Sequence, residues 1–337
     1  MASTYKAILD RIAESALANI DLHLSTKVTK IISNPNLSTD HPLGIAVSTN
    51  TDDAPFLYDE VVMTVPLGYL QRNLSTFSPP LPTHLSDAIS QGSYGRLEKV
   101  YVTFPTAYWS QATSDGTQKP FFTHFLHPTY ALKHNPKAWN MNCASLADLP
   151  GDASQPMLLF YMHGECAEHI TFLANGLDPN SQEYYDRLQP FFEPYYSRLP
   201  NYSSSSEDCI PKGYLATNWQ HDEFAGYGSY ANFQVSHGEG KVLLDKNIET
   251  IRNGAAERHI WFAGEHTAPF EALGTVTGAY WSGEHVAQRI LAVYGMLDKE
   301  GITGKSESSV SDGNYKGADS SNIEINGIAH GAGVVGL

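Results

Sequence analysis

Cysteine, positive charge and long hydrophobic runs are all scarce in this sequence of 337 residues. The three cysteines, Cys143, Cys166 and Cys209, are odd in number and widely spaced, so the sequence predicts neither a disulfide framework nor a metal site. Lys and Arg number 21 against 36 Asp and Glu, and the net charge of −15 argues against nucleic acid as a direct partner. No apolar run approaches the ~20 residues needed to span a membrane, so we expect no membrane partner.

We expect neither a secretory nor a peroxisomal signal at the ends of this sequence. The first residues, Met-Ala-Ser-Thr-Tyr-Lys, lack the apolar core of a secretory signal, and the final Val-Val-Gly-Leu is not a peroxisomal tripeptide. Together with the small number of cysteines, these features favour a reducing, cytoplasmic location. The negative charge would also concentrate a cationic substrate near the protein, although solubility is the simpler explanation.

The pattern of apolar residues indicates an α/β protein. Helical spacing predicts helices at 5–18, 182–195 and 275–294. A near-continuous apolar run at 60–65 predicts a strand that is covered on both faces of a sheet.

The length allows two domains, and the composition suggests where they lie. Residues 75–207 have long polar loops and aromatic strands, and we interpret them as an α+β domain inserted into a first domain formed by residues 1–74 and 208–299. The Gly- and Ser-rich segment 300–337 predicts a disordered tail.

The most informative stretch is 262–283, Phe-Ala-Gly-Glu-His-Thr-Ala-Pro-Phe-Glu-Ala-Leu-Gly-Thr-Val-Thr-Gly-Ala-Tyr-Trp-Ser-Gly. An apolar strand runs into a Gly-Glu pair, and a helix is expected to begin near residue 274. A carboxylate at a strand end can bind ribose hydroxyl groups, and bare N–H groups at a helix N-terminus stabilise negative charge on a ligand. This stretch closely resembles the C-terminal flavin-binding motif of the FAD-dependent amine oxidases, a superfamily that includes polyamine oxidases, monoamine oxidases and flavin histone-lysine demethylases.

The resemblance implies that this stretch holds FAD. Glu265, with Gly264 before it, would bind the ribityl or phosphate region of the cofactor. After Gly274, the backbone N–H groups of Thr275 and Val276 would face the pyrimidine edge of the isoalloxazine.

Residues 94–104, Tyr-Gly-Arg-Leu-Glu-Lys-Val-Tyr-Val-Thr-Phe, resemble the lysine-bearing segment of the same family. The resemblance implies that Lys99 is a catalytic residue, which holds a water hydrogen-bonded to flavin N5. A buried ammonium would be costly unless it faced a polar cofactor edge. The alternative is a surface lysine on an edge strand.

Residues 219–230, Trp-Gln-His-Asp-Glu-Phe-Ala-Gly-Tyr-Gly-Ser-Tyr, resemble the family segment that lines the substrate. The resemblance implies that Trp219 lies near the flavin and that Tyr230 forms one wall of an amine cage. A ring face suits such a wall because it attracts the cationic amine. The alternative is two core aromatics, and their spacing is one residue longer than in the common pattern. Ser229 stands where monoamine oxidases carry a flavin-linked cysteine, which implies that FAD is held non-covalently.

Two further segments complete the resemblance, which covers about residues 5–295. Val28 matches the strand whose backbone meets the adenine, and Thr64, Val65 and Pro66 match a strand end packed near the FAD. The second cage wall has small residues in place of a second tyrosine, which tilts the substrate towards a polyamine-like secondary amine.

The Gly-x-Gly-x-x-Gly loop with which this family binds FAD does not occur before residue 25. The resemblance therefore implies a Rossmann-like FAD-binding domain, discontinuous in sequence, from which the N-terminal β-α-β unit is missing. One match, at residues 331–336, would suit a circular permutation, but no helix follows it to direct N–H groups at phosphate, so the match is weak. A sheet without its core strand would expose an apolar edge, where we expect self-association or a partner chain.

The function that the resemblance implies is FAD-dependent oxidation of an amine. A hydride would pass from the carbon beside a neutral amine to flavin N5, O₂ would be reduced to H₂O₂, and the imine would be hydrolysed. The partners would then be a small-molecule amine and O₂. The rival hypothesis is a chain without catalysis, either an incomplete fragment or a subunit that needs a partner chain to supply the dinucleotide-binding loop.

Overall fold

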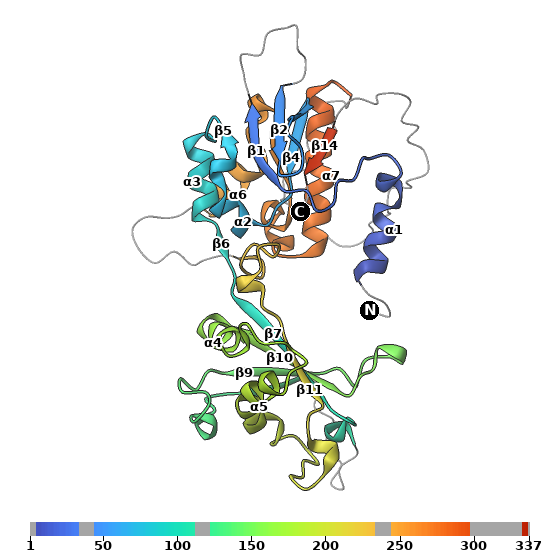
Figure 1. The fold of residues 1–337 in the computed structure, drawn as a ribbon, viewed down its shortest axis with the longest axis vertical. Helices are drawn as coiled ribbons and strands as arrows, with labels where there is room; N and C mark the ends of the chain where they lie inside the picture. Colours follow the sequence, from blue (N-terminus) through green and yellow to red (C-terminus); the bar gives the residue numbers. More distant parts are fainter. Residues whose placement is uncertain (1–4, 34–43, 112–121, 233–243, 297–331, 336–337) are drawn as a thin grey trace, which may run out of the picture. The chain divides into compact units, whose positions relative to one another are not determined.

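A computed structural model describes residues 5–33, 44–111, 122–232, 244–296 and 332–335 (Figure 1). They form two compact units, each made from two separate segments: unit 1 comprises residues 1–23 and 95–229, and unit 2 comprises residues 24–94 and 230–337. Each unit combines helices with a sheet, which confirms the predicted α/β class. None of the helices in the described part of the chain is long and apolar enough to cross a membrane.

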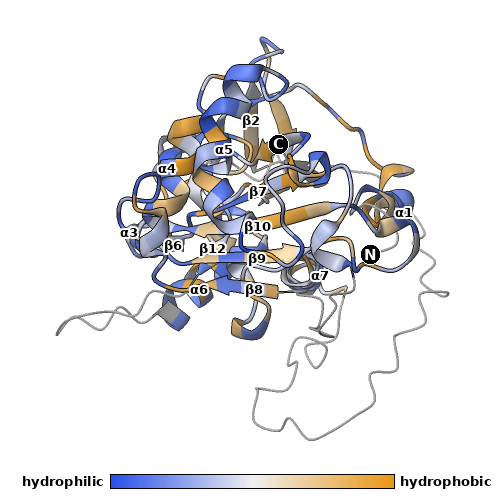
Figure 2. Ribbon diagram, turned by 90° about the horizontal axis from the view of Figure 1, so that it is seen from below, coloured by the Kyte–Doolittle hydropathy of each residue, from blue (hydrophilic) through white to orange (hydrophobic). Residues whose placement is uncertain are grey.

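Unit 1 is built on a five-stranded antiparallel sheet in the order β11-β7-β10-β9-β8. Its strands are β7 (Leu97–Thr103), β8 (Phe122–Phe125), β9 (Met141–Ser145), β10 (Met157–His163) and β11 (Gly213–Ala216), and its helices are α1 (Tyr5–Leu17), α4 (Gly164–Ala174) and α5 (Gln182–Tyr196). The helices predicted at 5–18 and 182–195 are thus confirmed as α1 and α5. Helix α4 packs against β7 and β10, and α5 packs against β11. Figure 2 draws the central strand β10 as largely hydrophobic.

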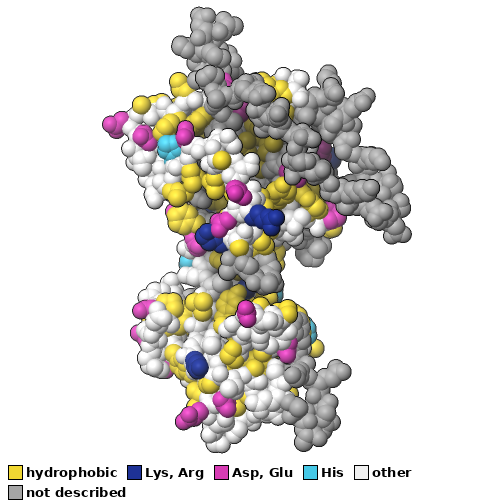
Figure 3. Space-filling view, turned by 90° about the vertical axis from the view of Figure 1, so that its right-hand side faces the viewer, with side chains coloured by type: hydrophobic (Ala, Val, Ile, Leu, Met, Phe, Trp, Pro, Cys, Tyr) yellow, Lys and Arg dark blue, Asp and Glu magenta, His cyan; other side chains and the backbone are white. Residues whose placement is uncertain are grey.

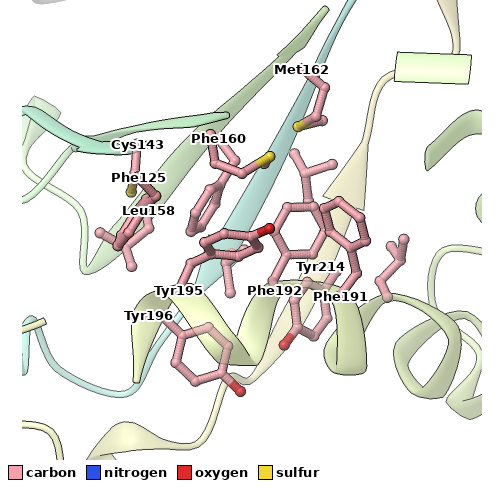
Figure 4. Close-up of a cluster of buried hydrophobic side chains, with 14 of the residues drawn as sticks. Phe125, Cys143, Leu158, Phe160, Met162, Phe191, Phe192, Tyr195, Tyr196 and Tyr214 are labelled. Atoms are coloured by element: carbon pink, nitrogen blue, oxygen red, sulfur yellow. The ribbon is translucent and has the colours of Figure 1, made fainter. Parts of the chain in front are cut away.

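Aromatic side chains dominate the core of unit 1 (Figure 4). The ring of Phe160 on β10 lies 5.0 Å from that of Phe192, and Phe125 meets Tyr195 edge-on at 5.2 Å. The Tyr195 hydroxyl accepts a hydrogen bond from Asn135 Nδ2 at 2.8 Å, so its polar tip is satisfied inside the core. This close packing holds the middle of the sheet, including β7, in a fixed position.

The described residues of unit 2 form three sheets. Strands β1 (Val28–Ser33), β2 (Ile45–Thr49), β3 (Phe56–Tyr58) and β5 (Phe77–Ser78) pair in the order β3-β2-β1-β5; β4 (Glu60–Met63), β13 (Ile260–Phe262) and β14 (Ala332–Val335) form a parallel sheet in the order β13-β4-β14; and β6 (Ser93–Tyr94) pairs with β12 (Ala231–Asn232). The helices are α2 (Leu67–Arg72), α3 (Thr83–Gln91), α6 (Leu244–Asn253) and α7 (Val276–Val293). The last of these confirms the helix predicted at 275–294.

Strand β4 is covered on both faces, as its apolar run predicts. Val61 and Met63 belong to the main core of unit 2, whereas Val62 packs on the other side with Trp261 and Val286. Neighbouring residues of a strand point to opposite faces, so an unbroken apolar run fits a strand between two packed layers.

Residues 1–74 were predicted to belong to one domain, but a boundary at 23/24 assigns the helix Tyr5–Leu17 to unit 1. The other unit boundaries lie at residues 94/95 and 229/230, whereas the composition suggested 74/75 and 207/208. The first of these two shifts arises because Phe77, Leu85 and Ile89 are buried in the core of unit 2. The second arises because β11 pairs with β7, which joins residues 213–216 to unit 1.

Part of the tail predicted to be disordered is a strand. Residues 332–335 form β14, which runs parallel to β4 with Ala332 opposite Glu60, while residues 300–331, 336 and 337 lie outside the described residues. The side of β4 that faces away from β13 offers unpaired N–H and C=O groups, and a short stretch of small and β-branched residues can satisfy them. The glycine-rich match at 331–336 is therefore extended over its four described residues.

Hydrophobic side chains also reach the surface of both units (Figure 3). In unit 1, no residue of α1 is buried, and Ile8, Leu9 and Ile12 are exposed. In unit 2, Val276 and Tyr280 of α7 are exposed. These helices carry apolar side chains that the described residues do not cover.

Candidate functional site

The first group of candidate residues lies in unit 1 around Lys99. Lys99 is half-buried on β7, and its Nζ lies 5.3 Å from the ring centroid of Trp219 and 5.7 Å from that of Tyr161. Among the described residues, no carboxylate forms an ion pair with Lys99. The ammonium is thus held by two aromatic faces, which attract a cation without occupying its N–H groups.

The alternative of a surface lysine on an edge strand is wrong, because β7 lies between β11 and β10. The structure also adds Tyr161, which the sequence analysis did not identify. Tyr161 on β10 is the cross-strand partner of Lys99, and such partners share a face of the sheet. Trp219 approaches from the short helix η6 (Trp219–His221), which follows β11.

The second group lies in unit 2 at the carboxyl ends of the parallel strands β4 and β13. Phe262 is paired with Met63, and the N–H of Ala263 donates to Met63 O at 3.0 Å. The residues that follow the two strands, Thr64 and Gly264, therefore leave the sheet at the same edge. In α/β sheets, ligands bind in the crevice at this edge.

Glu265 is the central side chain of this second group. Its Oε1 accepts the N–H of Ala231 at 2.9 Å, and its carboxylate also accepts the backbone N–H of Gly274. Its Oε2 is buried and has no hydrogen-bond partner. Burial raises the pKa of Glu265, and the two backbone hydrogen bonds oppose that shift without cancelling it.

Tyr230 and Gly274 fit against each other beside Glu265. Gly274 has a φ of 72°, which favours glycine, and a Cβ added there would lie 2.9 Å from Tyr230 Cδ2 and 3.0 Å from Ala231 O. The sequence analysis assigned no role to Tyr94. It lies in the same group, since burial and then the charge of Glu265 raise its pKa.

The N-terminus of α7 differs in one respect from the expectation. Thr275 caps the helix, because its Oγ1 accepts the N–H of Gly278 at 2.9 Å. Its own N–H donates to Ala272 O at 3.2 Å within the preceding turn, so it is not a bare donor as predicted. The N–H of Val276 lies in the first turn, where an α-helix supplies no acceptor, and it remains a candidate donor.

The remaining predicted residues also belong to unit 2 but are not among the contacts of Glu265. Val65 is buried and Pro66 immediately precedes α2, so both lie in the short link between β4 and α2. Val28 starts β1, in a different sheet, and packs half-buried against the main core. Over the described ranges, no three His, Cys, Asp or Glu side chains are grouped as metal ligands would be.

The residues of unit 2 fit part of a flavin cofactor. A buried carboxylate oxygen without a partner suits a hydroxyl donor, such as those on the sugar-like chain of a flavin. The first turn of α7 offers N–H groups and the positive end of a helix dipole. Gly264, with a φ of 138°, brings the backbone close at the strand end, where a Cβ would lie 2.8 Å from the His266 ring.

Comparison with known proteins agrees with these features. The family model described as flavin-containing amine oxidoreductase matches residues 3–291. The chain is 26% identical over 303 residues to polyamine oxidase 4 of Oryza sativa subsp. japonica, and 25% identical over 288 residues to lysine-specific histone demethylase 1 homolog 3 of Arabidopsis thaliana. A cofactor-binding redesign of putrescine oxidase, a triple mutant, has a similar fold, with a TM-score of 0.55 at 18% identity.

These matches cover most of the chain but only part of each relative. The chain is covered to 88% by the polyamine oxidase, 84% by the demethylase homologue and 84% by the putrescine oxidase structure. The chain in turn spans 51%, 15% and 52% of those three proteins. It thus spans about half the length of the two oxidases that it matches.

Proposed function

This chain belongs to the flavin-containing amine oxidoreductase family, and on that premise we propose that it oxidises a polyamine-like secondary amine with non-covalently bound FAD. The chemistry that FAD supplies when bound is acceptance of a hydride from the carbon beside the amine nitrogen, with O₂ then reduced to H₂O₂. The protein's own part is to bind, to orient and to hold protons at defined atoms.

The observation that carries the proposal is the environment of Lys99. Its ammonium lies against Trp219 and Tyr161 and has no carboxylate partner among the described residues. A lysine held in this way keeps its Nζ–H groups free to donate to a water molecule. In the proposed reaction, Lys99 Nζ holds the water that serves proton transfer beside the reacting amine.

Unit 2 would hold the cofactor. Glu265 Oε2, buried and without a partner, would accept a hydroxyl of the cofactor, and the Val276 N–H would donate to an acceptor on its ring system. Ser229 cannot form the thioether by which a cysteine links a flavin, which supports non-covalent binding.

The proposed substrate class rests on small residues and on charge. Small residues such as Gly274 stand where the family resemblance places a second cage tyrosine in monoamine oxidases, which suits a linear amine better than an aromatic one. The net charge of −15 favours the approach of a polycation. Two relatives are named as a polyamine oxidase and a lysine-specific histone demethylase, and these names support an amine as the substrate.

The test is a flavin titration followed by anaerobic reduction. We expect the purified chain to take up FAD and the visible flavin absorption to bleach when spermine is added without O₂. Lys99→Met should bind FAD equally but bleach far more slowly. A chain that binds FAD and is bleached by no amine would contradict the proposal.

A second candidate is a subunit that works only with a partner chain carrying the dinucleotide-binding loop. The observation that favours it is the apolar surface of α7 that the described residues leave exposed, where Val276 is 63% and Tyr280 49% exposed. Exposed apolar patches of this kind mark protein interfaces. In the same titration, this candidate predicts no FAD uptake by the chain alone.

A further inference from the structure

Glu98 is a charged residue on the apolar face of a central strand. It precedes Lys99 on β7 and is fully buried, as are Val100 and Val102 further along the strand. Alternate residues of a strand share a face, so Glu98 points with these two valines towards the core, while Lys99 points to the opposite side. A carboxylate in such a place is strongly destabilising unless donors satisfy it.

Among the residues that the structure describes, every donor to Glu98 comes from one short turn. Its Oε2 accepts from Thr217 Oγ1 at 2.5 Å and from the N–H of Trp219 at 3.2 Å. Its Oε1 accepts from the N–H of Gln220 at 3.0 Å and from Gln220 Nε2 at 3.4 Å. Within the described ranges, no basic side chain pairs with this carboxylate. The carboxylate therefore binds residues 217–220 together through hydrogen bonds.

The same turn is tied to the backbone of Lys99. The N–H of Lys99 donates to Thr217 Oγ1 at 2.8 Å, and the N–H of Thr217 donates to Lys99 O at 2.9 Å. The Thr217 hydroxyl thus accepts from residue 99 and donates to residue 98. A shift of the turn would break both links at once.

The two rings that hold the Lys99 ammonium are fixed by different means. Tyr161 is fixed by the register of β10 against β7. Trp219 lies beyond the end of β11, and its backbone N–H is held by Glu98. Glu98 therefore holds Trp219 in place although its own side chain lies on the opposite face of β7 from the Lys99 ammonium.

We infer that Glu98 is a positioning residue, which clamps the 217–220 turn so that the Trp219 ring lies over Lys99 Nζ. This inference rests on the proposed function for the role of Lys99 in amine oxidation, but the clamp itself is a property of unit 1. Glu98→Gln keeps the shape of the side chain, removes its charge and places an NH₂ group among donors. The turn should then move away and leave Lys99 with one aromatic partner.

The test reads the surroundings of Lys99 directly, without cofactor. Lysines of the purified 337-residue chain are reductively methylated with ¹³C-formaldehyde, which keeps their charge, and the Lys99 signal is assigned by its loss in Lys99→Met. Protons over aromatic ring faces are shifted upfield, so the wild-type Lys99 methyl signal should lie upfield of the other lysines. In Glu98→Gln the upfield shift should fall by at least half. The exposed Glu183→Gln, in the same unit, is the matched control and should change nothing.

Thr217 supplies a second pair of variants in case Glu98→Gln does not fold. Thr217→Val removes the hydroxyl at constant shape and should reduce the upfield shift, whereas Thr217→Ser keeps the hydroxyl and should preserve it. An unchanged Lys99 signal in folded Glu98→Gln, or in Thr217→Val, overturns the inference. So does a wild-type Lys99 signal with no upfield shift.

Kinetics separate this inference from the proposed function. If amines reduce the bound flavin, Glu98→Gln should lower the rate of reduction at least tenfold while the affinity for FAD stays unchanged. If no amine reduces it but the Lys99 signal still depends on Glu98 and Thr217, the clamp stands and the proposed function falls.

Discussion

Each unit contains a glutamate whose carboxylate accepts hydrogen bonds from a loop. The two carboxylates differ in how many of their oxygen atoms have a hydrogen-bond donor. Glu98 of unit 1 accepts four hydrogen bonds, two on each oxygen. Glu265 of unit 2 accepts backbone N–H groups of Ala231 and Gly274 and leaves Oε2 buried without a partner.

The difference separates a structural role from a binding role. Buried polar atoms without partners are rare in proteins because each destabilises the fold by about 1–3 kcal/mol. A fully satisfied carboxylate can be explained by the fold alone. A carboxylate with one buried oxygen that lacks a hydrogen-bond donor is better explained by a ligand that supplies this donor.

The largest expected effect comes from Lys99, which should affect turnover and leave cofactor binding intact. Lys99→Met removes the proposed water-holding group and should lower the rate of flavin reduction by about 10²- to 10⁴-fold. Stopped-flow absorbance with saturating spermine measures this rate, and a parallel titration measures the affinity for FAD. Lys137→Met, at an exposed lysine of unit 1, is the control. A rate within threefold of the wild type would remove Lys99 from the mechanism.

The next effect concerns stability and compares the two glutamates directly. Glu98→Ala leaves the donors of the 217–220 turn unpaired and should lower the free energy of unfolding by about 3 kcal/mol or more. Glu265→Ala also frees two N–H groups but removes an unsatisfied buried oxygen, so we expect about half that loss or less. Denaturant unfolding of the cofactor-free chains gives both values. Equal losses would mean that the carboxylates are satisfied to the same degree.

A third prediction concerns the affinity for FAD. Here we expect the larger effect from substitution of Glu265 and not of Glu98. Glu265→Gln keeps the shape of the side chain but weakens its hydrogen bond to a hydroxyl donor, so the Kd for FAD should rise about 10- to 100-fold. Flavin fluorescence titration measures it, with the exposed Glu271→Gln as the matched control. Glu98→Gln should leave this Kd unchanged. An unaltered Kd in Glu265→Gln would show that Oε2 meets no part of the cofactor.

The sequence alone predicts those parts of the site that depend on local pattern. Glu265 follows an apolar strand and precedes a helix, and this order is enough to place it at a strand end. The composition likewise predicts strands within residues 75–207, and β7, which carries Lys99, is one of them.

Contacts between distant segments could not be predicted in the same way. Tyr161 meets Lys99 because of the register between β7 and β10, which no local signal specifies. From the sequence alone, Glu98 resembles a charged residue that faces solvent. Its hydrogen-bond donors belong to residues 217–220, more than a hundred positions later, so its burial could not be predicted. The N–H of Thr275 was expected to be free, and a turn to Ala272 uses it instead.

The smallest expected effect is a pH dependence that tests the unsatisfied oxygen itself. Burial raises the pKa of Glu265 above its ordinary 4.5, so the folded protein holds that proton more tightly than the unfolded chain. Its contribution to stability is therefore present at low pH and is lost as the pH rises from about 4.5 through the folded-state pKa. The neighbouring His266 acts in the opposite direction, because complete burial lowers its pKa from 6.5 to about 4 and stability falls as the pH falls below 6.5.

Glu265→Gln removes the first of these contributions and keeps the second. The free energy of unfolding of the cofactor-free wild type minus that of Glu265→Gln should therefore decrease as the pH rises above 4.5 and then level off. Denaturant titrations of both chains over that pH range give this difference, in which the His266 contribution cancels. A difference that increases with pH would mean that the Glu265 carboxylate is stabilised in the fold. Its Oε2 would then already have a donor in the free protein, and the contrast with Glu98 would disappear.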